Sequence, residues 1–460
     1  MKSSRYLTIA LLVLIVSLTF HKIYDPDFWW HLAAGDRMWT THSILRVNTF
    51  SFTHPQYDWL DVYWLYQLAL SWLWHWGGAT AIIGFRLVLV LTLAALVLTG
   101  FRDRRQPLSA SEAGILVLSW LLLAPRLTDR PELVSFVLLA GMLALIRQGW
   151  WWWCVALEIV WANVHGFFFW GPFLLASAAV SGWITGDRRA ARTATLATVV
   201  TAAASLLSPF GWRNWLELPR LAASMRTLAS SIDELVSPFH PVVRARDGTC
   251  WLLIVFLALA VIMFGLNRRS VRPFDWIIMA ASLPLALAVR RGIPLFVLCA
   301  LPALLVATPR IGKPVACALV IGLCLALAIR LRIRGREFGL GMVENEFPSN
   351  AVEFVQQHIR GPLRLFNADF GTGGYLIAHG VPVFADERGE AYPTEFMREY
   401  FHAVEDDVAF GRMAQEYDVT HAFIVTSSAE TRAFARRVAS LPEWTTLYSD
   451  DIAVVLERRP

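Results

Sequence analysis

Two aspartates and a histidine directly follow the first apolar stretch of the chain, in the sequence Asp25-Pro-Asp-Phe-Trp-Trp-His31. Charged side chains at the edge of a membrane are costly and usually serve a function. A carboxylate here can accept a proton from a hydroxyl nucleophile or help to hold a divalent cation, and Trp29 and Trp30 can receive a sugar ring. The alternative is structural: the tryptophans form an aromatic belt, and the aspartates cap the helix that follows.

Arginines between apolar runs form a second group of candidates. Arg290 and Arg291 separate two such runs, and Arg126 and Arg130 share one short loop. Guanidinium groups bind phosphate oxygens in a bidentate manner, so these residues are candidate ligands for a lipid-linked phosphate. His165 ends another apolar run and can hydrogen-bond the same phosphate. The structural alternatives are side chains that snorkel to lipid headgroups, ordinary loop charge and a satisfied interfacial histidine.

Two further polar segments stand out in the sequence. The acidic pair Asp233-Glu234 lies among prolines and aromatic residues in the long loop 209–248, which we expect to form a mobile lid. A Gly-rich segment runs from Asp369 to Tyr375. It lacks the Lys of a P-loop and the spacing of a dinucleotide-binding turn, so we expect no nucleotide cofactor. Alternatively, its glycines serve only the backbone geometry of a turn.

The composition places these residues in a membrane protein. Of 460 residues, 56% are hydrophobic and 17% are charged, which is too apolar for an ordinary water-soluble domain. Apolar runs such as Leu87–Leu98 and Val315–Ile329, with their flanks, can cross a hydrocarbon core of about 30 Å. The five cysteines lie in or beside apolar segments without CxxC spacing, so neither a disulfide framework nor a zinc site is indicated. The net charge of +5 comes from arginines that orient helices, which argues against nucleic-acid binding.

The arginine-rich turns set the predicted topology. We place the amino terminus in the cytoplasm, so the first span crosses outward. The positive-inside rule places the basic turn Arg102–Arg105 in the cytoplasm, which requires one further span before it. We assign this span to Ala79–Gly100 and expect Asp61–Trp76 to be an interfacial or re-entrant helix. About eleven spans result, with the first loop, residues 24–76, and the tail on the outer face of the cell membrane. If Asp61–Trp76 spans instead, everything downstream inverts.

The predicted domains are a membrane module of residues 1–336 and a water-soluble α/β domain of residues 337–460. Charge density rises at this boundary, and short apolar segments alternate with polar ones. The expected strands are Leu363–Phe366, Val381–Ala385, Ala422–Val425 and Ile452–Leu456. The expected helices are Pro348–His358, Thr394–Ala403, Val408–Glu416 and Ala429–Ala439.

The first loop resembles that of the C-type membrane glycosyltransferases (GT-C). The resemblance lies in Asp25–Gly35, Asn48–Thr53 and Trp59–Gly78. It implies a polytopic helical fold and transfer of a sugar from a polyprenyl-phosphate carrier. Members of this superfamily use an Asp of this loop as the base, which implies Asp27 as the first choice and Asp25 as the second.

Two other segments resemble oligosaccharyltransferases. The Asp-aromatic-Gly core at Asp369 is similar to the motif of their outer domain that recognises the acceptor peptide. The run Ser231–Glu234 is similar to a short Glu-containing motif in their equivalent loop. For this kind of enzyme the resemblance implies a divalent cation such as Mg or Mn, held by Asp27 and Glu234.

These observations predict a membrane enzyme that transfers a sugar from a polyprenyl-phosphate donor to a glycan, lipid or protein acceptor on the outer face. Two alternatives stay open. One is transfer of a whole glycan to protein, with a metal ion. The other is a non-catalytic subunit that binds or assembles lipid-linked glycans, because the related GT-C branch often carries carboxylates where Asn48 and Tyr63 stand.

Overall fold

The chain divides into two compact units in a computed structural model that describes residues 2–102, 106–228, 233–246, 248–309, 337–343 and 346–459. Unit 1 comprises Met1–Lys22, Ala79–Trp215 and Ile232–Gly341, and unit 2 comprises Ile23–Gly78, Leu216–Ser231 and Met342–Pro460. Most of the first loop therefore groups with the tail rather than with the membrane helices. The predicted span Val315–Ile329 lies outside the described residues.

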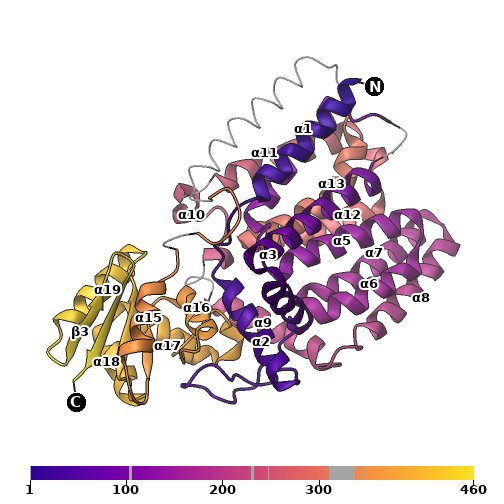
Figure 1. Cartoon of the computed structure of the whole chain (residues 1–460). Helices are drawn as coiled ribbons and strands as arrows, with labels where there is room; N and C mark the ends of the chain where they lie inside the picture. Colours follow the sequence, from indigo (N-terminus) through magenta and orange to yellow (C-terminus); the bar gives the residue numbers. More distant parts are fainter. Residues whose placement is uncertain are drawn as a thin grey trace. The chain divides into compact units, whose positions relative to one another are not determined.

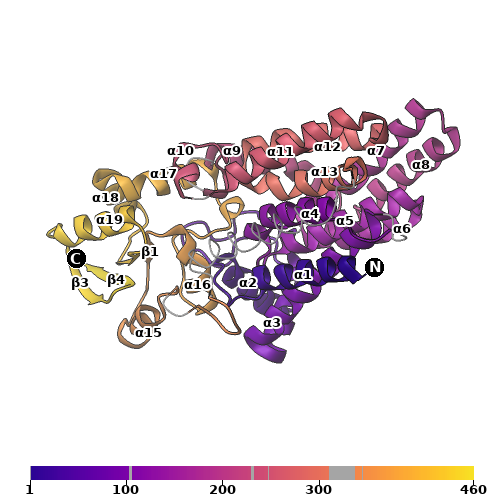
Figure 2. The same ribbon diagram turned by 90° about the horizontal axis from the view of Figure 1, so that it is seen from above.

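Unit 1 is built from α-helices joined by short turns. Figure 1 shows α5, α6, α7 and α8 side by side, and Figure 2 shows the same for α11, α12 and α13. Its described helices are α1 (Lys2–Thr19), the second part of α3 (Trp64–Gly100), α4 (Ala110–Leu123), α5 (Pro131–Gln148), α6 (Trp151–Val164), α7 (Trp170–Thr185), α8 (Arg188–Ala204), α10 (Pro241–Arg246), α11 (Thr249–Leu266), α12 (Pro273–Ala288) and α13 (Ile293–Ala307). Helix α9 (Arg213–Leu228) passes from unit 1 into unit 2.

The membrane character of the fold is confirmed by helix length and composition. Five described helical segments are long and apolar enough to cross a membrane: Trp64–Gly100, Pro131–Gln148, Gly166–Thr185, Thr249–Leu266 and Arg290–Ala307. Two shorter apolar helices are Arg5–Thr19 and Pro273–Ala288. The chain is thus an integral membrane protein, whereas the count of eleven spans and the side that each loop faces stay predictions.

Helix α3 is interrupted at Gly77 and Gly78. Both residues have non-helical backbone angles, and Gly78 has φ 56° and ψ −147°, a conformation that is essentially restricted to glycine. The element is therefore two helices that meet at a kink. The break falls where the sequence separates Asp61–Trp76 from the predicted span Ala79–Gly100.

Unit 2 contains a four-stranded sheet in the order β1-β2-β4-β3. Its strands are β1 (Leu365–Asn367), β2 (His421–Val425), β3 (Trp444–Ser449) and β4 (Ala453–Arg458). Strands β1 and β2 are parallel, whereas β4 is antiparallel to both of its neighbours. The helices of the unit are α2 (Asp27–Thr41), the first part of α3, α15 (Ser349–His358), α16 (Gly373–Ala378), α17 (Thr394–Glu405), α18 (Asp407–Glu416) and α19 (Ala429–Ser440). The predicted α/β character of the tail is confirmed.

One predicted strand is wrong and one strand was not predicted. Segment Val381–Ala385 forms a single bridge, between Val383 and Ser51, instead of a ladder. The side-chain oxygen of Asn367 accepts a 3.0 Å hydrogen bond from the backbone N–H of Phe384. This N–H therefore pairs with a side chain, whereas in a strand it would pair with the backbone of a neighbouring strand. Strand β3 escaped prediction because it lies at the edge of the sheet and exposes much of its polar sequence.

Candidate functional site

Four arginines and two glutamates of unit 1 form the arginine cluster: Arg126, Arg130, Glu132, Glu234, Arg290 and Arg291. A cavity of about 130 Å³ adjoins the cluster. Four cluster residues line it, together with Leu122 and Thr249: Arg126, Glu234, Arg290 and Arg291. The structure thus brings Arg290 and Arg291 to one site with the loop of Arg126 and Arg130, and their role as phosphate ligands stays a prediction.

The ends of short helices position these side chains. Arg130 has an extended backbone because Pro131 follows it and begins α5. Arg290 and Arg291 lie in η5 (Arg290–Gly292), which packs closely against α12. A Cβ atom on Gly292 would lie 2.4 Å from the backbone of Leu285, so only glycine allows this approach.

Each glutamate of the arginine cluster bridges two arginines. Glu234 Oε1 lies 2.6 Å from Nη1 of Arg126 and 2.8 Å from Nη1 of Arg130. Glu132 accepts a 2.8 Å hydrogen bond from Nε of Arg126, and its other oxygen lies 3.4 Å from Nε of Arg291. Three of the arginines thus pair with two carboxylates, and Arg290 lines the adjoining cavity. Several guanidinium groups held together in this way suit an anionic ligand.

The pKa shifts of Glu234 and His165 reflect the guanidinium groups near them. Burial alone would raise the pKa of Glu234, but the guanidinium groups around it prevail and hold that pKa well below its ordinary value. Burial, with the nearby charges of Arg291 and Arg126, holds the pKa of His165 well below its ordinary value. His165 is therefore neutral at pH 7 and lies within electrostatic reach of the cluster.

Unit 2 holds the acidic candidates Asp25 and Asp27. The Asp25 carboxylate is 3% exposed and accepts the backbone N–H of Asp27 at 3.1 Å, so it fixes the start of α2. Asp27 itself is half-buried. Burial raises the pKa of Glu387 well above its ordinary value, and the charges of Asp27 and Asp386 raise it further. Glu387 is thus a second carboxyl beside Asp27 that sequence reasoning did not select.

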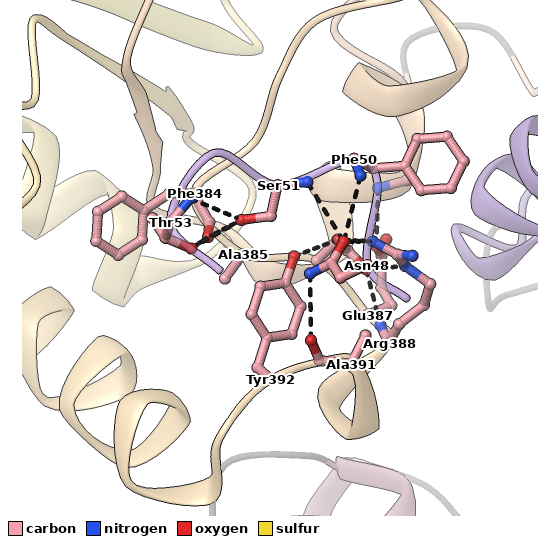
Figure 3. Close-up of polar contacts among 12 residues, drawn as sticks. Asn48, Phe50, Ser51, Thr53, Phe384, Ala385, Glu387, Arg388, Ala391 and Tyr392 are labelled. Carbon is pink, nitrogen blue, oxygen red and sulfur yellow. Dashed lines mark hydrogen bonds and ion pairs between the residues drawn. The ribbon is translucent and has the colours of Figure 1, made fainter. Parts of the chain in front are cut away.

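Asn48 is a buried contact between the first loop and the tail within unit 2 (Figure 3). Its side-chain oxygen accepts hydrogen bonds from the backbone N–H of Phe50 at 3.2 Å and from Nη2 of Arg388 at 3.1 Å, and its amide donates to the carbonyl of Ala391 at 3.2 Å. Arg388 in turn makes two 2.7 Å hydrogen bonds to Asp386. In this structure position 48 therefore serves to hold the loop against the tail.

The acceptor candidates Asp369 and Tyr375 make local contacts in unit 2. Asp369 accepts hydrogen bonds from the backbone N–H of Gly371 at 3.2 Å and from the hydroxyl of Thr372 at 2.9 Å, which caps η6 (Phe370–Thr372). Tyr375 is 5% exposed and stacks on Phe347 with ring centroids 5.2 Å apart. An acceptor role for either residue stays a prediction, as it does for Asp233, which begins η3 (Asp233–Leu235).

Close packing accounts for two glycines of the Gly-rich segment. A Cβ atom on Gly373 would lie 2.5 Å from Cβ of Asp386, and one on Gly374 would lie 3.0 Å from the backbone nitrogen of Trp30. Gly373 therefore allows α16 to pack closely against Asp386, and Gly374 allows its close approach to Trp30 of α2. This observation favours the structural interpretation of these two glycines.

A metal role for Asp27 and Glu234 stays a prediction. Within the part of the chain that the structure describes, no group of three or more His, Cys, Asp or Glu side chains could hold a metal ion. The two residues belong to different units. In unit 1, Glu234 already pairs with two arginines.

No protein-family model and no curated protein matches the sequence. Solved structures do share its fold. One is the oligosaccharyltransferase of Archaeoglobus fulgidus tethered with an acceptor peptide that contains the NVT sequon, with TM-score 0.62 and 11% identity over 92% of this chain and 69% of that chain.

ArnT from Cupriavidus metallidurans also shares the fold. In its apo state it has TM-score 0.58 and 12% identity over 97% of this chain and 96% of that chain. Bound to undecaprenyl phosphate it has TM-score 0.55 and 13% identity over 98% and 97%. Both proteins are membrane glycosyltransferases of the GT-C superfamily. At this level of identity the likeness concerns the fold, and the chain has the GT-C fold that its first loop implied.

Proposed function

We propose that this protein transfers a sugar from a polyprenyl-phosphate donor to an acceptor on the outer face of the membrane. The arginine cluster carries the proposal, because several guanidinium groups beside a cavity in an apolar helical unit suit a lipid-linked phosphate. In this role Arg290, Arg291 and Arg130 bind the donor phosphate, and neutral His165 can add a hydrogen bond. ArnT, which shares this fold, binds undecaprenyl phosphate, and this supports the choice of lipid.

The proposed chemistry is a single inverting displacement. An acceptor hydroxyl attacks the anomeric carbon of the sugar and gives its proton to the carboxylate of Asp27. The bond between the anomeric carbon and the phosphate oxygen breaks, and polyprenyl phosphate leaves. The guanidinium groups stabilise the negative charge that develops on the leaving phosphate. Asp27 is preferred to Asp25 as the base because Asp27 is half-buried, whereas Asp25 is only 3% exposed.

A second candidate function is transfer of a glycan to protein. The likeness to the oligosaccharyltransferase with its tethered acceptor peptide, at TM-score 0.62, favours this candidate. Asp369 and Tyr375 would then recognise the acceptor, and activity would require a divalent cation. A chelator that abolishes transfer, with recovery on addition of Mg or Mn, would select this candidate over the first.

Sugar transfer in reconstituted vesicles tests the proposal. A panel of radiolabelled polyprenyl-phosphate sugars is offered to the unmodified protein, to Asp27→Asn and to the control Asp36→Asn. Asp36 lies on the same helix, where it pairs with His75 at 3.0 Å. We expect Asp27→Asn to lower transfer by about 100-fold or more, because it removes a general base, and Asp36→Asn to retain activity.

Two outcomes would contradict the proposal. If Asp27→Asn retains full activity, the base is another residue. If the folded, unmodified protein transfers no sugar from any donor, the enzyme proposal fails and the non-catalytic binding subunit gains support.

A further inference from the structure

The carboxylate of Glu234 occupies the place that an anionic ligand would take on Arg126 and Arg130. One carboxylate oxygen contacts both guanidinium groups, at 2.6 and 2.8 Å, and the other accepts a 3.0 Å hydrogen bond from Arg130. A phosphate oxygen bound by two arginines would make the same charge-assisted contacts. Within the cluster, these two arginines are thus already neutralised in part by the chain itself.

Of the two glutamates in the arginine cluster, Glu234 is the one that a ligand can replace. Glu132 lies in the first turn of α5, and its side chain is 1% exposed. Glu234 lies on the three-residue element η3, and its side chain is 29% exposed. Glu234 also lines the cavity, whereas Glu132 does not line it.

The backbone around Glu234 is anchored independently of its carboxylate. The backbone N–H of Arg290 donates to the carbonyl of Val236 at 3.1 Å, and the hydroxyl of Ser237 donates to the carbonyl of Leu287 at 2.8 Å. The Glu234 side chain can therefore leave the arginines while the segment that carries it stays attached to η5 and α12.

We propose that Glu234 is an internal anion that the donor phosphate displaces from Arg126 and Arg130 on binding. The proposal rests on the proposed function, because it takes a lipid phosphate as the ligand of the arginine cluster. The donor is a phosphodiester with one negative charge, as a carboxylate has, so one anion on the two arginines replaces another of equal charge. Undecaprenyl phosphate, the monoester that transfer releases, presents phosphate oxygens to the same arginines and serves as the probe. Glu234 thereby sets the donor affinity: it keeps the two arginines paired in the empty site, and it competes with each arriving phosphate.

Undecaprenyl phosphate binding to the full chain in phosphatidylcholine nanodiscs tests the inference. The variants are Glu234→Gln, which removes the charge, and Glu234→Asp, which keeps the charge but shortens the reach. The matched control is Glu217→Gln. Glu217 pairs with Arg220 at 2.9 Å and its side chain is 27% exposed, close to the 29% of Glu234.

We expect Glu234→Gln to bind undecaprenyl phosphate about tenfold more tightly than the unmodified protein, because a competing charge-assisted pair is gone. Glu234→Asp should also bind more tightly, by a smaller factor, and Glu217→Gln should match the unmodified protein. The response of Glu234→Asp separates displacement from a general gain in positive charge, because this variant has the same charge as the unmodified protein. Thermal unfolding of each variant shows whether it is folded.

Two further titrations distinguish a polyprenyl lipid from other sources of phosphate. Phosphatidylglycerol and inorganic phosphate are titrated in the same way. A gain confined to undecaprenyl phosphate supports displacement by a polyprenyl-linked phosphate. An equal gain for phosphatidylglycerol would overturn the choice of polyprenyl lipid in favour of a membrane headgroup, and an equal gain for inorganic phosphate would overturn it in favour of any phosphate. Equal undecaprenyl phosphate affinity in folded Glu234→Gln, Glu234→Asp and unmodified protein would overturn the inference alone. If no folded protein binds undecaprenyl phosphate, the proposed function fails as well.

Discussion

The two units use arginine in different ways. In unit 2, Arg388 and Asp386 are both fully buried, and one carboxylate faces one guanidinium group at 2.7 Å. In unit 1, three arginines, Arg126, Arg130 and Arg291, share two glutamates, and Arg290 lines the same cavity. A matched buried pair specifies structure, because either partner alone would be a costly buried charge. A group of arginines that share carboxylates at a cavity is instead suited to an anionic ligand.

The largest effect that we expect in this comparison is on stability, from Arg388→Leu. This change leaves the Asp386 carboxylate buried without its cation and removes the contact to Asn48, so it should destabilise the protein by about 3–5 kcal/mol. The matched control is Arg364→Leu, which removes an exposed pair with Asp418 and should cost about 1 kcal/mol or less. Thermal unfolding in detergent measures both. Equal shifts of the unfolding midpoint would contradict a structural role for the buried pair.

A smaller effect, on ligand affinity, should follow from Arg290→Ala in unit 1. We expect it to raise the KM for the donor by about tenfold, because one guanidinium contact to the phosphate is lost. The unfolding midpoint should change little, because this side chain is only partly buried. Donor titration in the transfer assay measures the change. An unchanged KM with a large loss of stability would mean that Arg290 has a structural role, as Arg388 has in unit 2.

The third expected effect is a pH dependence that arises in unit 2. Burial raises the pKa of Asp61 from 3.8 to about 8, so the folded protein holds a proton there that the unfolded chain releases. The contribution of Asp61 to stability is therefore complete below pH 4 and is lost as the pH rises to about 8. Asp61→Asn mimics the protonated form and should flatten this slope. Unfolding midpoints between pH 5 and 8 test this, and equal slopes in both proteins would contradict it.

Local patterns in the sequence predicted much of the fold and part of the site. The periodicity of apolar residues identified α17, α18 and α19 because each buries one face within the tail. The arginines of unit 1 could be selected because guanidinium groups between apolar runs are unusual wherever they occur. Each of these inferences depends on neighbouring residues alone.

Pairings between distant residues could not be predicted. Arg130 and Glu234 are 104 residues apart, and Asn48 and Arg388 are 340 residues apart. Nothing in the residues around Glu234 reveals that it faces arginines rather than an acceptor or a metal ion. Glu387 was missed for the same reason, because its neighbour Asp27 lies at the other end of the chain. Only the tertiary fold brings such partners together.

The most direct test of the account is the kinetic difference between Asp27→Asn and Arg290→Ala at varied donor concentration. If Asp27 moves a proton and Arg290 binds phosphate, the first change should lower kcat with little change in KM, and the second should raise the donor KM with a smaller effect on kcat. The opposite pattern, with KM raised by Asp27→Asn and kcat alone lowered by Arg290→Ala, would contradict the roles that we assign to the two units.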